Sequence, residues 1–343
     1  MRRFQIVTCL LVAALSLIFI AAKKKDQVPG VDRPIRILYV TWGHDAVAQQ
    51  EMTAGAKIAR PDVKVQVLIE DNEWKLEREI SILETYLTQD IDAIVVSVID
   101  PKALEPIFAR YKERGVWCLA TAGQVANQDL GFITDETRAG LLAGQKLKEW
   151  WPKNKGSEKV KAFLVGMPNT PNVEAKINGL RQYVKENKME SWVTFVQEEN
   201  GNGNLEESMK VATPAFTAHP DMNFIWGVND SSVLGAYKAA VELELDRVCA
   251  VGMGGEASAL AELVKPLGPN NTGWIFEIAY AKNFAEYGYS LITSAIYLVQ
   301  KGTAKGAPPI DIGHIALDRD NVQQFIDGQQ DWRKRAGLPP LKF

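Results

Sequence analysis

The chain has 343 residues, of which 46% are hydrophobic and 24% are charged, and its formal net charge is −3. This length exceeds one typical hydrophobic core and fits two domains. The near-neutral charge provides no basic surface for nucleic acid, so DNA and RNA are excluded as partners.

The N-terminal residues have the pattern of an export signal. Two arginines precede an apolar stretch from Phe4 to Ala22, and three lysines follow it. A basic start, an apolar middle and the pair Ala21-Ala22 favour a signal peptide over residues 1–22, cleaved after Ala22. An uncleaved membrane anchor is the alternative, because this stretch is just long enough to span a bilayer. Either way, the folded part is expected in the periplasm or on the extracytoplasmic face of the membrane.

After a linker at 26–34, short apolar runs rich in β-branched residues alternate with amphipathic helical stretches. Runs separated by one helix each indicate parallel strands, which need a crossover and are buried on both faces. Strands are predicted at 35–41, 63–69, 91–98, 116–121, 160–166, 192–197, 223–228, 246–252, 272–277 and 310–317. Helices are predicted at 46–59, 74–89, 101–114, 136–151, 172–188, 204–218, 230–243, 256–265 and 279–300, followed by a polar helix that ends in Arg333–Arg335.

The pattern restarts after Asp135, which predicts an α/β protein of two similar lobes. A late helix long enough to cross back indicates that several segments join the lobes. In open sheets of this kind, ligands bind beyond the carboxyl ends of the strands. The space between the lobes is therefore the expected site.

Three segments carry a resemblance to a known family. The stretch AHPDMNFIWGVNDSSVLGAYKAAVE at 218–242 resembles the ribose-type periplasmic binding proteins, the type I sugar-binding family of ABC importers. FITDETRAGLLAG at 132–144 is similar to the hinge and following helix of that family. AVGMGGEASALAELV at 250–264 is similar to its Val-Gly-Phe-Asp-Gly strand end. The resemblance covers about residues 35–317.

The resemblance implies two doubly wound, Rossmann-like lobes joined by a multi-strand hinge. The N-terminal lobe would comprise 35–135 plus 278–305, and the C-terminal lobe 136–277 plus 306–343. The crossings would fall near Asp135, Glu277 and 304–310, with Asp135 as the hinge residue.

The resemblance also implies ligand contacts. Asn229 matches an Asn of the family's ligand site, and Glu277 stands where the family has a Gln. Lys176 replaces an Arg, which keeps the charge but loses the planar guanidinium fork. Ala122 and Gly254 occupy the places of two aspartates that bind sugar hydroxyls, so the usual acceptors are missing.

Other polar residues at strand ends could replace those acceptors. Asp45 and Asp100 each follow a predicted strand, and Trp42 and His44 stand where the family has stacking aromatic rings. The full set of predicted ligand contacts is Trp42, Asp45, Asp100, Lys176, Asn229, Asp230 and Glu277.

Several of these residues have an alternative, purely structural role. Asn229 and Asp230 can be helix caps. Lys176 can lie on a solvated helix face. Glu277 can form a hinge salt bridge instead of accepting a ligand. The three histidines have no ligand at metal-binding spacing, so no metal site is predicted. Cys118 and Cys249 are expected as buried apolar thiols.

The sequence has no nucleophile with a base, acid/base pair or cofactor motif, so we expect neither an enzyme nor a bound cofactor. The leading hypothesis is a monomeric solute-binding protein that captures a small polar ligand, such as a sugar, by hinge closure and delivers it to an ABC permease. GMGGEASALAEL also resembles the autoinducer-2-binding relatives. The alternative is therefore a ligand-sensing subunit that signals through a membrane sensor kinase.

Overall fold

The first of two sheets is entirely parallel. A computed structural model describes residues 27–41, 47–73, 75–132, 134–168, 170–307 and 312–341. The strands of this sheet pair in the order β2-β1-β3-β4-β5. Their bounds are β1 Ile35–Thr41, β2 Val65–Asp71, β3 Ala93–Ser97, β4 Trp117–Thr121 and β5 Leu130–Phe132.

The second sheet repeats this order and adds one strand. Its order is β11-β10-β9-β8-β6-β7, parallel except for the antiparallel pair β10/β11. The bounds are β6 Val160–Gly166, β7 Val193–Asn200, β8 Phe224–Gly227, β9 Cys249–Gly254, β10 Gly273–Tyr280 and β11 His314–Leu317. Read as β7-β6-β8-β9-β10, the sheet has the topology of β2-β1-β3-β4-β5. The doubly wound α/β fold predicted from the sequence is confirmed in both lobes.

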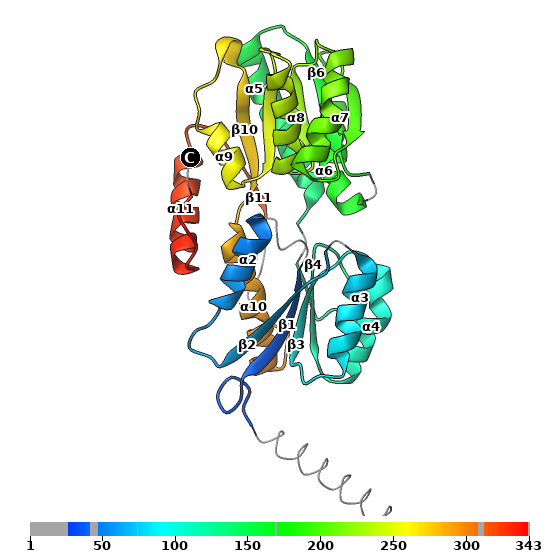
Figure 1. The fold of residues 1–343 in the computed structure, drawn as a ribbon, viewed down its shortest axis with the longest axis vertical. Coiled ribbons are helices and arrows are strands. Elements are labelled where there is room, and N and C mark those ends of the chain that lie inside the picture. Colours follow the sequence, from blue (N-terminus) through cyan, green and yellow to red (C-terminus); the bar gives the residue numbers. More distant parts are fainter. Residues whose placement is uncertain are drawn as a thin grey trace, which may run out of the picture.

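Helices cover both faces of each sheet (Figure 1). In the N-terminal lobe, α2 and α10 cover one face and α3 and α4 the other. In the C-terminal lobe, α5 and α6 cover one face, and α7, α8, α9 and α11 the other. Their bounds are α2 Val47–Lys57, α3 Leu76–Leu87, α4 Pro101–Glu113, α5 Glu136–Lys155, α6 Pro171–Glu186, α7 Leu205–Ala218, α8 Asp230–Glu242, α9 Ala257–Leu263, α10 Phe284–Lys301 and α11 Val322–Arg335, with a short 3-10 helix at Pro269–Asn271.

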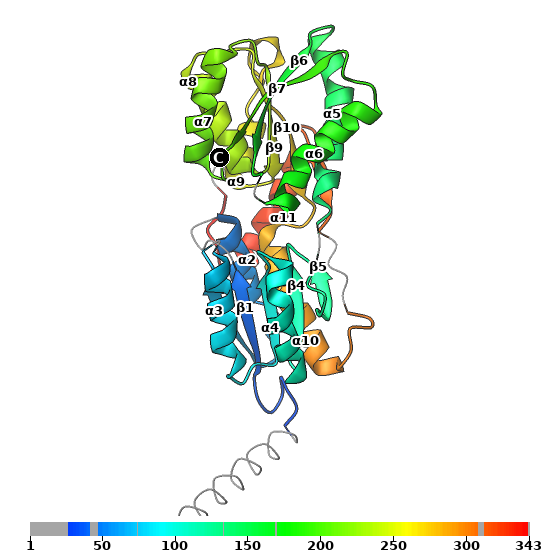
Figure 2. The same ribbon diagram turned by 90° about the vertical axis from the view of Figure 1, so that its right-hand side faces the viewer.

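The chain passes between the lobes three times: from β5 to α5, from β10 to α10 and from α10 to β11. Residues 308–311 of the third passage lie outside the described residues. Figures 1 and 2 show the carboxyl ends of both sets of strands directed at the opposite lobe. The fold therefore brings the loops after these strands toward one another.

Two differences from the sequence prediction bear on the site. β5 was not predicted, because it is three residues long with Gly131 at its centre. β10 continues to Tyr280, three residues beyond its predicted end, because it pairs with β11 up to Tyr280 opposite His314. Glu277 is therefore inside a strand, and the second crossing begins after Tyr280.

Two further expectations concern the N-terminus and the thiols. The predicted signal peptide or anchor at 1–22 lies outside the described residues. Within the described ranges, no helix combines the length and apolar character that crossing a bilayer requires. Cys118 and Cys249 are free and buried, as expected.

Candidate functional site

Each sheet reverses its winding direction at one point, between β1 and β3 and between β6 and β8. Ligands of doubly wound sheets bind beyond the strand ends at such a point. Asp100 follows β3, and Asn229 follows β8 at the equivalent place in the other lobe. Trp42, His44 and Asp45 follow β1 but lie outside the described residues, so their roles stay predictions.

Asp100 and Asn229 are both helix N-caps. Oδ1 of Asp100 accepts hydrogen bonds from the backbone N–H groups of Lys102 at 2.9 Å and Ala103 at 3.3 Å. Oδ1 of Asn229 accepts from the N–H of Ser232 at 2.9 Å, and its Nδ2 donates to the carbonyl of Gly203 at 2.8 Å. Capping leaves Oδ2 of Asp100 and one N–H of Asn229 for another partner. A cap and a ligand contact are therefore compatible at both positions.

Lys176 is buried rather than solvated, with 5% of its surface exposed. Its ammonium group donates to the carbonyl of Val228 at 2.9 Å and to the hydroxyl of Tyr280 at 3.2 Å. It also lies 3.4 Å from Oε2 of Glu136. These three partners match its three N–H groups. A ligand that contacts Lys176 must displace one of them.

A close approach of α5 and α6 places Lys176 beside Glu136. A Cβ on Gly140 of α5 would lie 2.1 Å from the carbonyl oxygen of Lys176, and one on Gly179 of α6 would lie 2.2 Å from that of Thr137. Only glycine fits at such distances. These two glycines bring the middle of α6 against the first turns of α5, where Glu136 lies.

Glu136 joins all three crossings of the hinge. It directly follows Asp135, the exposed N-cap of α5, which accepts from the N–H of Arg138 at 3.2 Å. The Tyr280 hydroxyl, at the end of β10, donates to Oε1 of Glu136 at 3.2 Å. Nε2 of His314, at the start of β11, lies 3.6 Å from Oε2. This cluster was not predicted from the sequence, although Glu136 stands next to the predicted hinge residue.

The Glu136 carboxylate is charged despite its burial. Burial by itself would raise its pKa, but the ammonium of Lys176, the nearby His314 and a hydrogen bond from Thr134 lower it to about 2. Burial and the adjacent Glu136 charge raise the pKa of Tyr280 well above its ordinary value, so its hydroxyl remains a donor. The hinge is thus held by an ion pair inside a polar cluster.

Asp230 and Glu277 form a second buried group, and both are 0% exposed. Asp230 accepts from the N–H groups of Met253, Gly255 and Glu256 at 2.7–2.9 Å. Glu277 accepts from the N–H of Gly255 at 2.9 Å and from Nε1 of Trp274 at 3.1 Å. Both carboxyls thus fix the loop after β9 in this structure, and their ligand contacts stay predictions.

The two carboxyls also share a hydrogen bond. Burial raises the pKa of Glu277 well above its ordinary value, and the charge of Asp230 raises it further. Asp230 receives three backbone N–H groups, which favour its charged form. We therefore assign the shared proton to Glu277.

The loop that Asp230 and Glu277 hold carries a carboxyl toward the other lobe. Glu256 stands two residues after Gly254, where the aspartate is missing, and it is half-buried. Burial, followed by the charges of Asp230 and of Glu51 on α2, raises the pKa of Glu256 to about 8. Perturbed carboxyls of this kind cluster at functional sites. Glu256 was not among the ligand contacts predicted from the sequence.

A direct hydrogen bond joins the lobes at Ala122, the second position where the family has an aspartate and this chain does not. Nδ2 of Asn172, at the start of α6, donates to the carbonyl of Ala122 at 2.9 Å. Ala122 follows β4 and has a positive φ of 64°. The backbone at this position contacts the opposite lobe, although the acidic side chain is absent.

Two doubly wound lobes with facing strand ends, joined by three crossings, define the class of two-lobed binding proteins. Residues 38–304 match the family model described as a periplasmic binding protein domain. The chain belongs to this family. The resemblance seen in the sequence is thereby confirmed.

Two proteins related in sequence are named as sugar-binding proteins. The chain is 25% identical over 176 residues to a D-ribose/D-allose-binding protein of Pseudomonas aeruginosa, covering 49% of this chain and 53% of the relative. It is 20% identical over 278 residues to the galactofuranose-binding protein YtfQ of Escherichia coli, covering 71% and 80%. The chain thus spans about half the length of the first relative and most of the second.

A solved structure confirms the shared fold. An ABC transporter solute-binding protein from Mycobacterium smegmatis with bound glycerol superposes with a TM-score of 0.72 at 16% identity. The match covers 85% of this chain and 96% of the other.

Proposed function

We propose that this protein is an extracytoplasmic solute-binding protein that captures a small polar ligand, a sugar or sugar-like molecule, and delivers it to an ABC importer. The observation that carries this proposal is the pair of like lobes whose strand ends face each other across a three-crossing hinge. Two of the relatives are named as sugar-binding proteins. Their names do not favour the sensing alternative.

Capture proceeds by hinge closure. Ligand contacts from both lobes favour the closed arrangement only by their difference in affinity for the two states. Asp100 and Asn229 offer unused polar atoms at equivalent strand ends of the two lobes. Glu256 adds a carboxyl that can accept a solute hydroxyl. The loop after β1, with Trp42 and Asp45, completes the proposed site, and Asp135 serves as a hinge residue.

The proposal also covers the lobe boundaries, the export segment, the oligomeric state and the membrane partner. We assign the lobes to 35–135 plus 281–305 and to 136–280 plus 306–343, which moves the boundary predicted after Glu277 to the end of β10. Residues 1–22 direct export as a cleaved signal peptide or a membrane anchor. The protein acts as a monomer, binds its solute without chemical change and meets an ABC permease as its partner.

A thermal-shift screen tests this function. The panel includes D-ribose, D-allose, D-galactose, myo-inositol and glycerol, and a specific ligand raises the melting temperature by mass action. Consumption of a compound without a shift for any solute would contradict the proposal.

Asn229→Asp is the sharpest site variant, because it keeps the capping oxygen but removes both N–H donors, the free one and the one bonded to Gly203. Asn229→Ala would also lose the cap of α8, at a cost of about 1 kcal/mol. Asn283→Asp is the matched control, since Asn283 caps α10 through the same kind of bond. We expect weaker solute binding for Asn229→Asp only. Equal affinity in the two variants removes Asn229 from the site.

A further inference from the structure

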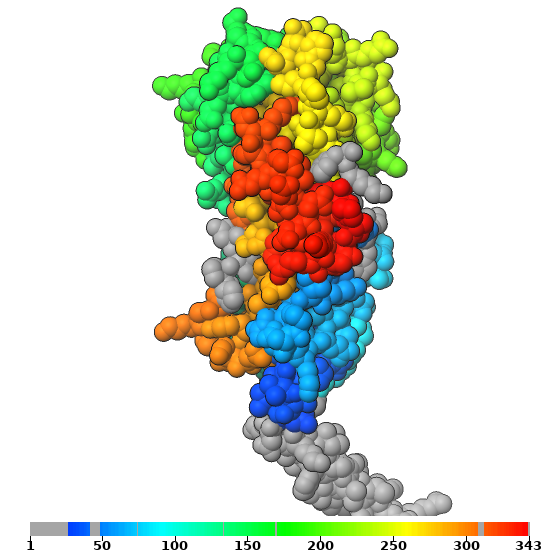
Figure 3. Space-filling model, turned by 90° about the vertical axis from the view of Figure 1, so that its left-hand side faces the viewer, coloured from blue at the N-terminus to red at the C-terminus, as the bar shows by residue number. Residues whose placement is uncertain are grey.

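Helix α11 follows the last strand of the C-terminal lobe, yet it extends across the junction of the lobes. Figure 3 shows the C-terminal segment, in red, lying over both halves of the molecule. Among the described residues, α11 contacts α10 of the N-terminal lobe in addition to its own lobe. Away from the crossings, the hydrogen bond from Asn172 to Ala122 also joins the lobes.

The first half of α11 is anchored in the C-terminal lobe. Val322 and Ile326 are buried in the core formed with α7, α8 and α9. Nε2 of Gln329 donates to the carbonyl of Gly255 at 3.0 Å. Phe325 packs at the same glycine, where an added Cβ would lie 3.2 Å from its ring. This half therefore moves with the C-terminal lobe and touches the loop that carries Glu256.

The second half of α11 is anchored on the N-terminal lobe. Arg333 forms a hydrogen-bonded ion pair with Glu51 of α2, and the side chains are 11% and 7% exposed. The ring of Trp332 packs on Tyr289 of α10 with 5.4 Å between centroids. We call the contacts Arg333–Glu51 and Trp332–Tyr289 the clasp.

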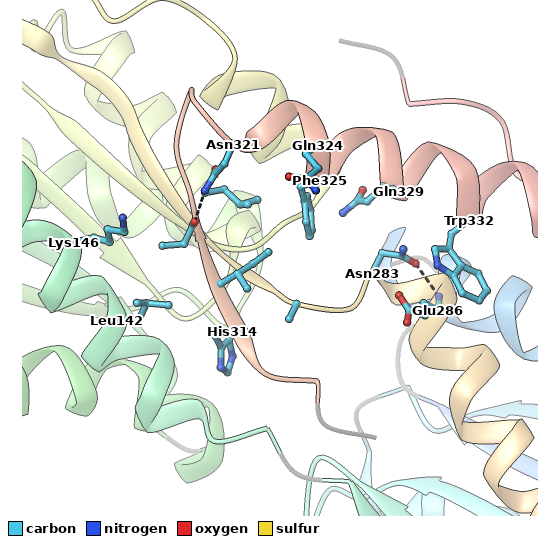
Figure 4. A pocket seen from close by; sticks show the side chains of 15 residues that line it. Leu142, Lys146, Asn283, Glu286, His314, Asn321, Gln324, Phe325, Gln329 and Trp332 are labelled. Carbon is cyan, nitrogen blue, oxygen red and sulfur yellow. Dashed lines mark hydrogen bonds between the residues drawn. The ribbon is translucent and has the colours of Figure 1, made fainter. Parts of the chain in front are cut away.

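A groove of about 700 Å³ lies beside α11 between these two anchors (Figure 4). It is lined by α5, the β10–α10 connection, β11 and α11 itself, with Leu142, Asn283 and Gln324 among its residues. The helix is therefore not packed along its whole length. Room beside it permits the clasp to shift without disturbing a core.

We propose that α11 is a strap that stabilises the separated arrangement of the lobes, and that hinge closure breaks the clasp. The helix is rigid and fixed in the C-terminal lobe, so rotation of the lobes displaces Arg333 from Glu51. Interactions present in only one of two states shift the equilibrium toward that state. The strength of the clasp therefore sets how readily the lobes close.

The test removes the ion pair and leaves no lone charge. The double variant Glu51→Gln with Arg333→Gln does this, whereas a single change would leave one buried charge unpaired. Lys334→Gln is the matched control, because Lys334 is the exposed neighbour on the same helix. Spin labels at Glu77→Cys of α3 and Glu206→Cys of α7 report the distance between the lobes in a Cys9→Ser background, since Cys118 and Cys249 are buried.

Double electron–electron resonance is measured on the ligand-free full chain. We expect the ratio of short-distance to long-distance populations to rise about tenfold in the double variant, a typical coupling between two states, and not to change in Lys334→Gln. Far-UV circular dichroism verifies the fold. If the double variant does not fold, Trp332→Ala loosens the same clasp and must produce the same shift.

An unchanged distance distribution in a folded clasp variant overturns the proposal, as does an equal shift in the Lys334→Gln control. The measurement needs no solute. Its failure would therefore leave the solute-binding proposal intact, and a failed solute screen would leave the strap intact.

Discussion

Replacing Glu136 by Gln should destabilise the protein at neutral pH and make it less sensitive to acid. The substitution keeps the shape of the side chain but removes its charge. Lys176 then remains buried without its ionic partner, only 6% of its side chain being exposed. Losing one member of a buried pair is costly because the other charge is left uncompensated.

The magnitude follows from the pKa of Glu136, which the fold lowers from 4.5 to about 2. This difference corresponds to about 3 kcal/mol of stability. A carboxyl with a lowered pKa stabilises the fold above its unfolded pKa, and this contribution is lost as the pH falls toward the folded pKa. The Glu136 carboxylate should therefore contribute about 3 kcal/mol to the free energy of unfolding at pH 6 and roughly 1.4 kcal/mol at pH 3.

Urea denaturation at several pH values between 6 and 3 measures the effect. The free-energy difference between wild type and Glu136→Gln should narrow by about 2 kcal/mol over this range. Glu149→Gln is the control, because Glu149 lies on the same helix with 48% of its side chain exposed, 3.8 Å from Lys146. It should change stability by less than about 0.5 kcal/mol at any pH.

A constant difference across the pH range would refute this reasoning. So would a Glu136→Gln protein as stable as wild type at pH 6. Either result would mean that the Glu136 carboxylate does not hold the hinge through its charge.

Three further predictions concern the interior. Gly140→Ala should lower the free energy of unfolding by about 1–3 kcal/mol, because the added methyl group forces α5 away from α6. Gly328→Ala is the control, since Gly328 has open space around it, and it should leave stability unchanged or raise it. Calorimetry compares the two variants. The pKa of Glu277 is raised in the folded state, so above about pH 4.5 the unfolded chain loses this proton while the folded protein keeps it, and the stability of the wild type falls. Glu277→Gln has no such proton, so its stability relative to wild type should increase between pH 5 and 8 in urea titrations. Burial raises the pKa of Cys249 to about 12 and that of Cys118 further, so neither thiol should react with a disulfide reagent at pH 8 until urea unfolds the chain.

Much of the candidate site was predictable where a local pattern marked it. Asn229 and Asp100 follow apolar runs and precede helices, so the sequence placed both at strand ends, where the structure has them. Burial was not predictable in the same way. Lys176 was open to interpretation as a solvated residue, and only the contact between Gly140 and α6 explains why it is inside.

Two elements show the limit of a local pattern. The three-residue strand β5 is too short to produce a periodicity, and the last residues of β10 are a strand only because β11 pairs with them. Hydrophobic alternation reports burial along one segment. It does not report which distant segment completes a sheet.

The sequence by itself determined the number of lobes, the order of their elements and the family, because β-branched runs, helical amphipathicity and short motifs are properties of neighbouring residues. Only the tertiary structure decided the partners of the charged groups. Glu136 meets Tyr280 across 144 positions of the chain, and Glu51 meets Arg333 across 282. Charge attraction has no periodicity along the chain. These contacts depend on the folded positions of three crossings and of α11, which no single segment of the sequence encodes.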